Sequence, residues 1–322
     1  MFEENENNYP VKPEYVADLS GRNRIMFLIT IVAIFLMSGE FIRESYIILL
    51  ELLGVFFIHE LGHYLMMRFF GVKAQGMFLM SVFGDRSNKM EHSTSQKQQA
   101  MINLMGPIPG IIAGVILFWF AAKSEAPTII AIEVSLLLIL VNVLNMLPLD
   151  PFDGGRIMEV FFFYRNDQHK MIFTLVSSLV LIGAGIILWF WPLTIFGFLM
   201  GLKVRGFQKS KEVHDELEES DVNYKKEYKD LTNKEYWKIR AAFLVQNPKL
   251  KDVIPSGYTL WENENFIVER VRQILRINIK PDLGFESKIL VLILMVSTVV
   301  FPLWLIITNI EIVYWYFENA SF

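Results

Sequence analysis

The chain has 322 residues, of which 53% are apolar, and a mean hydropathy of +0.37. Its formal net charge of −4 excludes the strongly basic balance of a nucleic-acid-binding protein. The absence of cysteine excludes disulfides and thiolate metal sites, so any metal must be held by His, Asp or Glu.

Residues 1–23 are polar and acidic and lack the apolar core of a signal peptide, so the first apolar segment is expected to act as an uncleaved signal anchor. Apolar runs long enough to cross about 30 Å of hydrocarbon then recur along the chain. We expect transmembrane helices at seven segments: 24–39, 45–69, 100–121, 127–148, 171–190, 191–204 and 288–310. Trp191-Pro192 breaks one long apolar stretch, which predicts a hairpin of two short helices there.

The distribution of basic residues predicts the orientation in the membrane. If the N-terminus is cytoplasmic, all of the 30 Lys and Arg residues except Arg43 and Lys123 fall on the cytoplasmic side. Seven spans then place the C-terminus outside. We therefore expect a multi-pass protein of a bacterial cytoplasmic membrane with a cytoplasmic N-terminus.

Four regions follow from the changes in composition. They are a polar cytosolic segment (1–23), a transmembrane region (24–204), a soluble helical cytosolic insert (205–287), and a last transmembrane helix with a short tail (288–322).

Helix signals support the helical character of the insert. Thr232 and Glu235 form a capping-box pattern before an amphipathic run that reaches Leu244, and residues 261–274 predict a second helix. The insert is expected to pack on the membrane region, and a regulatory or substrate-recruiting role is the alternative.

The segment His59-Glu60-Leu61-Gly62-His63 carries the strongest chemical signal. Positions i and i+4 share one face of a helix, so both imidazoles can meet one metal ion. Glu60 is then placed to take a proton from a metal-bound water and to pass it to a leaving amine. Three ionisable residues within a predicted membrane span are costly in lipid, which favours a functional role.

Two histidines do not complete a catalytic zinc site, which usually has three protein ligands and a water. The best source of a third ligand is the stretch 145–155, where prolines and a glycine pair break the helix at membrane depth. It holds two carboxylates, Asp150 and Asp153. The predicted topology returns this stretch to the cytoplasmic side, where His59 and His63 also lie.

Three motifs in this order resemble the site-2 protease family of intramembrane zinc metalloproteases: His59-Glu60-Leu61-Gly62-His63, Asn103-Leu104-Met105-Gly106-Pro107, and Asn145-x-x-Pro148-x-x-Pro151-x-Asp153-Gly154. The resemblance covers about residues 45–165 and implies a three-helix catalytic core. It implies one Zn²⁺ per chain, held by His59, His63 and Asp153, with Glu60 as general base. Asp150 stays a competing carboxylate, and Asp153 is preferred because the family's Asp-Gly pair matches Asp153-Gly154.

The resemblance also implies roles in binding or positioning the substrate. Asn145 would help to position it or to polarise the scissile carbonyl, and the other residues implied are Gly106, Pro107, Pro148, Pro151 and Gly154. In relatives, the segment equivalent to residues 71–84 is a membrane-dipping β-hairpin, to whose edge an extended substrate could add. A plain connecting loop is the alternative.

The expected protein is an all-α polytopic membrane protein that hydrolyses peptide bonds of membrane-spanning or membrane-anchored substrates. Its expected partners are a transmembrane substrate, the lipid bilayer and a regulatory partner of the insert, with no nucleic acid. One alternative is a membrane zinc protease that trims lipidated C-termini, which normally takes Glu as its third ligand. Another is a non-enzymatic protein that binds membrane segments.

Overall fold

The computed structural model describes residues 9–15, 46–72, 95–163, 166–251, 253–255, 257–276 and 279–319. These residues are mostly helical, and they contain no strand beyond one isolated parallel bridge between Ser95 and Lys280. The predicted span at 24–39 lies outside the described residues, and so does the predicted hairpin at 71–84 after its first two residues.

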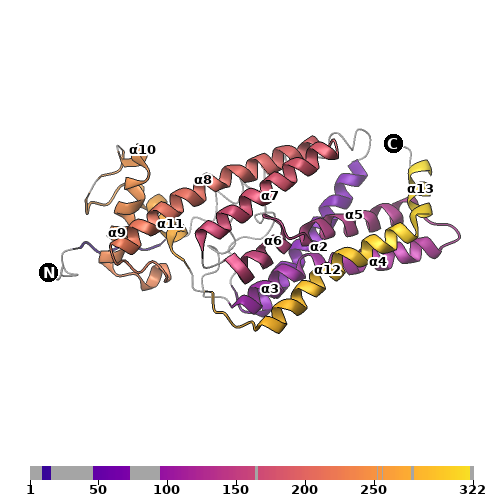
Figure 1. Cartoon of the computed structure of the whole chain (residues 1–322), viewed down its shortest axis with the longest axis horizontal. Helices are drawn as coiled ribbons and strands as arrows, with labels where there is room; N and C mark the ends of the chain where they lie inside the picture. Colours follow the sequence, from indigo (N-terminus) through magenta and orange to yellow (C-terminus); the bar gives the residue numbers. More distant parts are fainter. Residues whose placement is uncertain are drawn as a thin grey trace.

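The α-helices of the described residues, labelled as in Figure 1, are α2 (Tyr46–Phe69), α3 (Gln96–Met105), α4 (Pro107–Lys123), α5 (Ile129–Met146), α6 (Asp153–Met158), α7 (Asp167–Ile187), α8 (Trp191–Glu219), α9 (Asn233–Val245), α10 (Pro248–Lys251), α11 (Glu264–Ile274), α12 (Phe285–Thr308) and α13 (Ile310–Asn319). A π-helical turn at Glu159–Phe163 extends α6, and a 3-10 turn at Tyr228–Asp230 precedes α9.

Within the described part of the chain, five helical stretches are long and apolar enough to cross a membrane: Leu50–Phe69, Gln96–Lys123, Ile129–Met146, Asp167–Ile187 and Phe285–Thr308. The second of these joins α3 and α4. Large apolar side chains on these helices point outward; Leu290 and Ile307 of α12, for example, are each 68% exposed. Lipid favours such a surface, whereas water opposes it.

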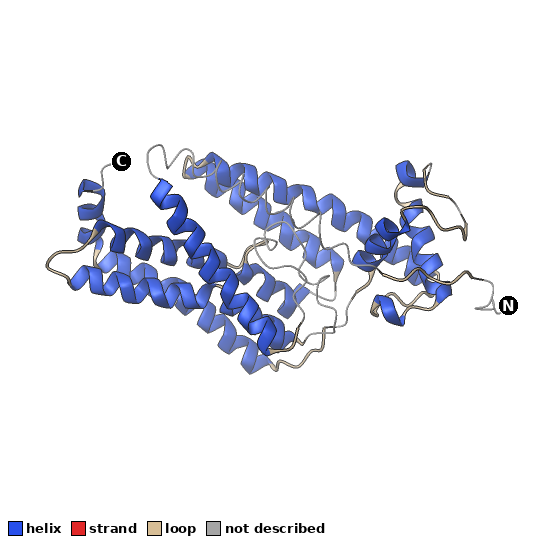
Figure 2. Cartoon of the chain, turned by 180° about the vertical axis from the view of Figure 1, so that it is seen from behind, coloured by secondary structure: helices blue, strands red, loops and turns tan. Residues whose placement is uncertain are grey.

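The predicted count of seven spans is not confirmed. The predicted span at 191–204 is the first part of α8, which continues unbroken across the predicted domain boundary at residue 205 and is not among the five stretches. α7 and α8 pack side by side as a helical pair (Figures 1 and 2), where the Ser178 hydroxyl donates to the Gly197 carbonyl at 2.7 Å. At the turn between them Trp189 is 94% exposed, a placement typical of interfacial tryptophans.

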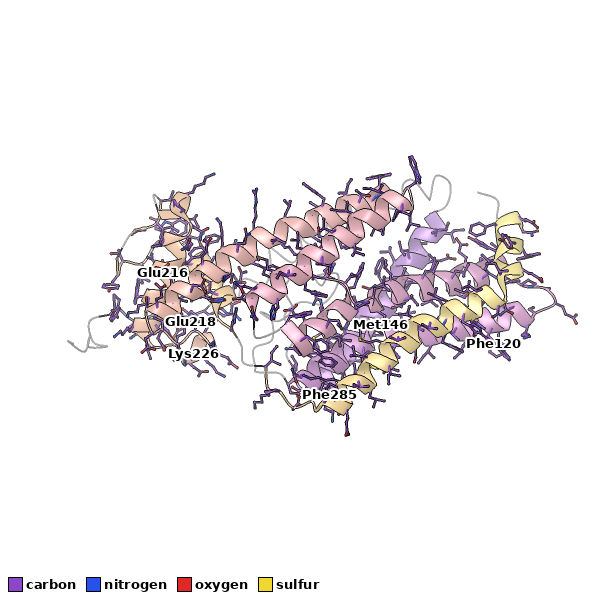
Figure 3. All side chains as sticks on the ribbon, viewed as in Figure 1. Phe120, Met146, Glu216, Glu218, Lys226 and Phe285 are labelled. Atoms are coloured by element: carbon purple, nitrogen blue, oxygen red, sulfur yellow. The ribbon has the colours of Figure 1, made fainter. Side chains whose placement is uncertain are left out.

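The second half of α8, the turn at Tyr228–Asp230 and helices α9, α10 and α11 form a separate apolar core, which we call the helical unit. It lies at one end of the molecule, and α13 lies at the other (Figure 1). Its labelled charged side chains, Glu216, Glu218 and Lys226, stand apart from Phe120 and Phe285 on the membrane helices (Figure 3). The predicted capping box is present at the start of α9, where Thr232 and Glu235 exchange hydrogen bonds with each other's backbone N–H.

A buried ionic network crosses the core of the helical unit. Glu264 at the start of α11 accepts from the Arg240 guanidinium at 2.7 Å and from the Tyr236 hydroxyl at 2.6 Å. It also accepts from the backbone N–H of Trp261 at 2.9 Å. Arg240 is only 1% exposed, so its charge depends on this carboxylate for compensation.

We expect Glu264→Ala to destabilise the helical unit by about 3–5 kcal/mol, because it leaves a buried guanidinium unpaired. Hydrogen–deuterium exchange of α9 and α11 in the full-length protein measures this as a loss of protection. Glu262→Ala is the matched control, because Glu262 is exposed. Equal protection in the two variants would contradict the assigned role of the network.

Candidate metal centre

The two histidines of α2 and the first residue of α6 meet in the interior of the membrane helices. His59 is 3% exposed, His63 is fully buried, and Asp153 is 3% exposed. α2 contacts α3, α4 and α5, and α6 contacts α3 and α5. Three helices, α3, α4 and α5, therefore pack against the two that carry the cluster, so that water and lipid are largely excluded from it.

The ligating atoms of these three residues converge on one point. The Nε2 atoms of His59 and His63 are 3.1 Å apart, and each lies 3.0 Å from Oδ2 of Asp153. Ligands of a tetrahedral zinc ion, each about 2.0–2.1 Å from the metal, lie about 3.4 Å from one another. The three atoms thus have nearly the spacing of three corners of a zinc tetrahedron.

Hydrogen bonds on the far side of each ring determine which nitrogen faces the cluster. Nδ1 of His59 lies 2.8 Å from Oδ1 of Asn142, whose amide nitrogen donates to the Leu138 carbonyl, so the oxygen is the atom that faces the ring. Nδ1 of His63 lies 2.7 Å from the Ile102 carbonyl. Both partners are acceptors, so both Nδ1 atoms carry the proton in the neutral rings and both Nε2 lone pairs face Asp153.

This arrangement places two imidazole lone pairs and a carboxylate oxygen against one another in a buried site. Three electron-rich atoms so close together repel one another unless a cation lies between them. Two neutral imidazoles and one carboxylate are a donor set that suits zinc and leaves a fourth position for water. His59, His63 and Asp153 therefore fit a zinc ion, with Asn142 and the Ile102 carbonyl orienting the rings.

The two candidate carboxylates of the loop between α5 and α6 face different partners. Asp150 accepts from the Thr174 hydroxyl at 2.9 Å, and its backbone N–H donates to Ser177, so it is directed toward α7. Asp153 lies beyond the cis Asp150-Pro151 bond, at the start of α6, and faces the histidines.

Two glycines allow this loop to fold back against the end of α5. A Cβ on Gly154 would lie 2.2 Å from the Met146 carbonyl oxygen, and one on Gly155 would lie 2.2 Å from that of Leu149. No side chain fits at either position, which explains a glycine pair directly after Asp153.

The break between α3 and α4 makes room for His63. Pro107 begins α4 and removes one backbone donor, which separates the two helices. A Cβ on Gly106 would lie 2.2 Å from Nε2 of His63, and one on Gly62 would lie 1.8 Å from the Met105 carbonyl oxygen. Gly106, for which the resemblance implies a role in binding or positioning the substrate, lies against His63.

The remaining site residues from the sequence lie around the cluster. Glu60 is half-buried beside His59, and Pro148 and Pro151 belong to the loop before α6. Asn145 donates to the Val141 carbonyl of its own helix at 2.9 Å. Their roles in catalysis and substrate binding stay predictions.

Sequence reasoning missed Asn142, although a signal for it was present. The buried residues of α5 include Ile132, Ser135, Ile139, Asn142 and Met146, which recur at helical spacing and mark its packed face. A polar amide on the packed face of an apolar span needs a partner, and His59 supplies it.

Comparison with known proteins reveals relatives of the chain. The model of peptidase family M50 matches residues 47–132. A zinc metalloprotease of Methanocaldococcus jannaschii is 28% identical over 140 residues, which is 42% of this chain and 39% of that protein. These matches support the resemblance of this part of the chain to the site-2 protease family.

The chain is also similar to a solved structure, the site-2 protease from M. jannaschii. The TM-score is 0.43 at 21% identity, with 56% of this chain and 87% of that chain covered. The chain spans about two fifths of the length of the curated relative it matches. The family-model match and the five apolar helices of the described residues support an integral membrane protein.

The family-model match covers only part of the metal centre. It contains His59, Glu60 and His63 but ends before Asp153. The interatomic distances and the surrounding motif support Asp153 as the third ligand.

We expect Asn142→Ala to weaken zinc binding about 10- to 100-fold, because His59 loses the acceptor that fixes its orientation and tautomer. Competition with a chelator, followed by metal analysis of the purified protein, measures the change. Asn145→Ala, on the same helix, is the matched control and should bind zinc as the wild type does. A larger loss of zinc in Asn145→Ala would exclude Asn142 as the orienting residue.

Gly106→Ala should also lower zinc affinity, because the added methyl group overlaps the His63 ring and forces it away from Asp153. Gly54→Ala is the control on a membrane helix, since a Cβ there meets nothing within 4 Å. The same chelator competition measures both variants. Unchanged zinc affinity in Gly106→Ala would show that the close approach is not required.

Proposed function

We propose that the chain is an intramembrane zinc metalloprotease that hydrolyses peptide bonds of membrane-spanning or membrane-anchored proteins. The observation that supports this most is the convergence of His59, His63 and Asp153 inside a bundle of apolar helices. Three electron-rich atoms this close together repel one another, so packing alone does not explain their placement.

A zinc ion held by these residues would supply a polarising charge and would lower the pKa of a bound water to about 7. Glu60 follows His59 on the same helix and is half-buried, so it can accept a proton close to the cluster. We assign Glu60 as the general base that takes this proton and later gives it to the leaving amine.

The substrate must reach the cluster as an extended chain, because a helical segment hides its peptide carbonyls in its own hydrogen bonds. The loop from Pro148 to Phe152 borders the site. Asn145, one turn before the loop, is proposed to position the substrate or to polarise the scissile carbonyl. In this proposal Pro148, Pro151 and Gly154 shape the backbone that the substrate meets.

We further propose that the helical unit and residues 9–15 face the cytosol and that α13 lies outside. This orientation follows the distribution of Lys and Arg along the chain. It agrees with the placement of the helical unit and α13 at opposite ends of the molecule (Figure 1). A bacterial cytoplasmic membrane is the proposed location.

The proposal predicts that Glu60→Gln keeps zinc but loses proteolysis by about 10²- to 10⁴-fold, because only the proton transfer is removed. Asp153→Ala should lose both zinc and proteolysis. Mass spectrometry of new protein termini in membranes that contain each variant measures cleavage, and metal analysis measures zinc. The termini that depend on Glu60 should lie within or next to membrane spans.

Asp150→Ala is the matched control, because its carboxylate is directed to Thr174 rather than to the histidines. It should keep zinc and most of the activity. If Asp153→Ala retains zinc, the third ligand lies elsewhere. If the protein termini in Glu60→Gln membranes are the same as those of the wild type, the chain is not the protease.

A further inference from the structure

The helical unit holds a segment of the chain that is remote in sequence. Residues 9–15, Tyr-Pro-Val-Lys-Pro-Glu-Tyr, have no regular secondary structure and lie against α9, α11 and the turn at Tyr228–Asp230. More than 200 residues separate the hydrogen-bonded partners, such as Trp237 and Pro10. Figure 1 shows this segment, in indigo, beside α9 at the end of the molecule farthest from α13.

The backbone of the segment is held at three successive points. The Trp237 indole N–H donates to the Pro10 carbonyl at 2.8 Å, and the Tyr228 hydroxyl donates to the Pro13 carbonyl at 2.8 Å. Between them, the backbone N–H of Lys12 donates to Oδ1 of Asn233 at 2.9 Å. Proteins that recognise proline-containing peptides also use aromatic side chains that donate hydrogen bonds to the carbonyls of an extended chain.

Backbone carbonyls surround the ammonium group of Lys12. Its Nζ donates to the backbone carbonyls of Tyr228 at 2.8 Å, Lys229 at 2.9 Å and Leu231 at 2.6 Å. An ammonium has three N–H groups, and all three are satisfied here. Nζ also lies 5.3 Å from the centre of the Tyr228 ring. Three acceptors match the three donors of an ammonium better than the five donors of a guanidinium.

Aromatic contacts hold both ends of the segment. Tyr9 is 7% exposed and meets Tyr258 edge to face, with ring centres 4.8 Å apart. Arg272 of α11 lies over the Tyr15 ring at 3.7 Å. By contrast, Val11 is 76% exposed, and Glu14 is also exposed. The helical unit therefore contacts the side chains of Tyr9, Lys12 and Tyr15 and the backbone carbonyls of Pro10 and Pro13, and it leaves the side chains of Val11 and Glu14 exposed.

We propose that the surface of the helical unit that holds residues 9–15, which we call the peptide groove, is an exchangeable peptide-binding site. It takes an extended tyrosine-, proline- and lysine-containing segment of a partner protein, with residues 9–15 as its resident ligand. The resident segment resembles a bound peptide in that its contacts are three backbone hydrogen bonds, one caged ammonium and two aromatic ends. Its covalent link to the chain raises its effective concentration at the groove. A partner segment of the same chemistry then competes with it. This inference does not depend on proteolysis.

A single substitution in the full-length chain makes the exchange measurable. Lys12→Ala removes the caged ammonium of the resident ligand and leaves the groove itself unchanged. A fluorescent synthetic peptide of residues 7–17 should then bind the detergent-purified Lys12→Ala chain at least ~10-fold more tightly than it binds the wild type, because the weakened resident segment is displaced. Fluorescence anisotropy measures both affinities. Val11→Ala is the matched control chain and should behave as the wild type does, because Val11 is exposed.

A second peptide tests whether binding requires the ammonium group of Lys12. Norleucine in place of Lys12 keeps the aliphatic stem and removes only the ammonium, so this peptide should bind the Lys12→Ala chain at least ~10-fold more weakly than the parent peptide does. Tyr228→Phe in the Lys12→Ala chain tests the groove, because it removes the donor to the Pro13 carbonyl and keeps the ring. It should weaken binding of the parent peptide.

The inference is overturned if the parent peptide fails to bind the Lys12→Ala chain at millimolar concentration, since residues 9–15 would then be a fixed part of the fold. It is also overturned if the norleucine peptide binds as well as the parent. Neither measurement uses catalysis or zinc, so failure here leaves the proposed protease function intact. Equally, loss of the protease proposal would leave the peptide site in place.

Discussion

The two Nδ1 hydrogen bonds of His59 and His63 are the constraint on which the metal centre depends. An imidazole in a membrane span would otherwise rotate to pair with whatever polar group is nearest. Here Asn142 and the Ile102 carbonyl fix both rings on their far sides, so both Nε2 atoms are free of protons and directed at Asp153. The site is thus preorganised for a cation, because its ligands need not reorient to bind one.

The backbone geometry of several helices follows from that constraint. The Ile102 carbonyl reaches His63 only if α3 approaches α2 closely, and Gly62 and Gly106 permit that approach. Asn142 reaches His59 only if α5 packs tightly on α4, and Gly110 leaves space for its amide, since a Cβ there would lie 2.2 Å from Nδ2 of Asn142. Small residues at helix crossings are the usual device in lipid, where burial of apolar area gives little driving force. Here they also determine where the polar groups sit.

The sequence is sufficient to predict the parts of the site that depend on local spacing. An i, i+4 pair of histidines must share a helix face, and the ends of two spans on one side of the membrane bring Asp153 into range. Asn142 is harder to predict than Asn145, because its role depends on which face of α5 turns toward α2. The predicted boundary at residue 205 falls inside α8. Hydropathy falls there, but α8 continues as an amphipathic helix, so a change in environment is not a change in secondary structure.

The helical unit and the metal centre are joined by an unbroken series of contacts. Asp167, the first residue of α7, pairs with His214 of α8 and with Arg276 just beyond α11. Further along α7, Thr174 and Ser177 hold Asp150, which lies in the same loop as Asp153. An occupant of the peptide groove and the third metal ligand are therefore connected through α7. Such a connection transmits a change only if α7 has two discrete arrangements, because packed helices shift between states rather than deform continuously.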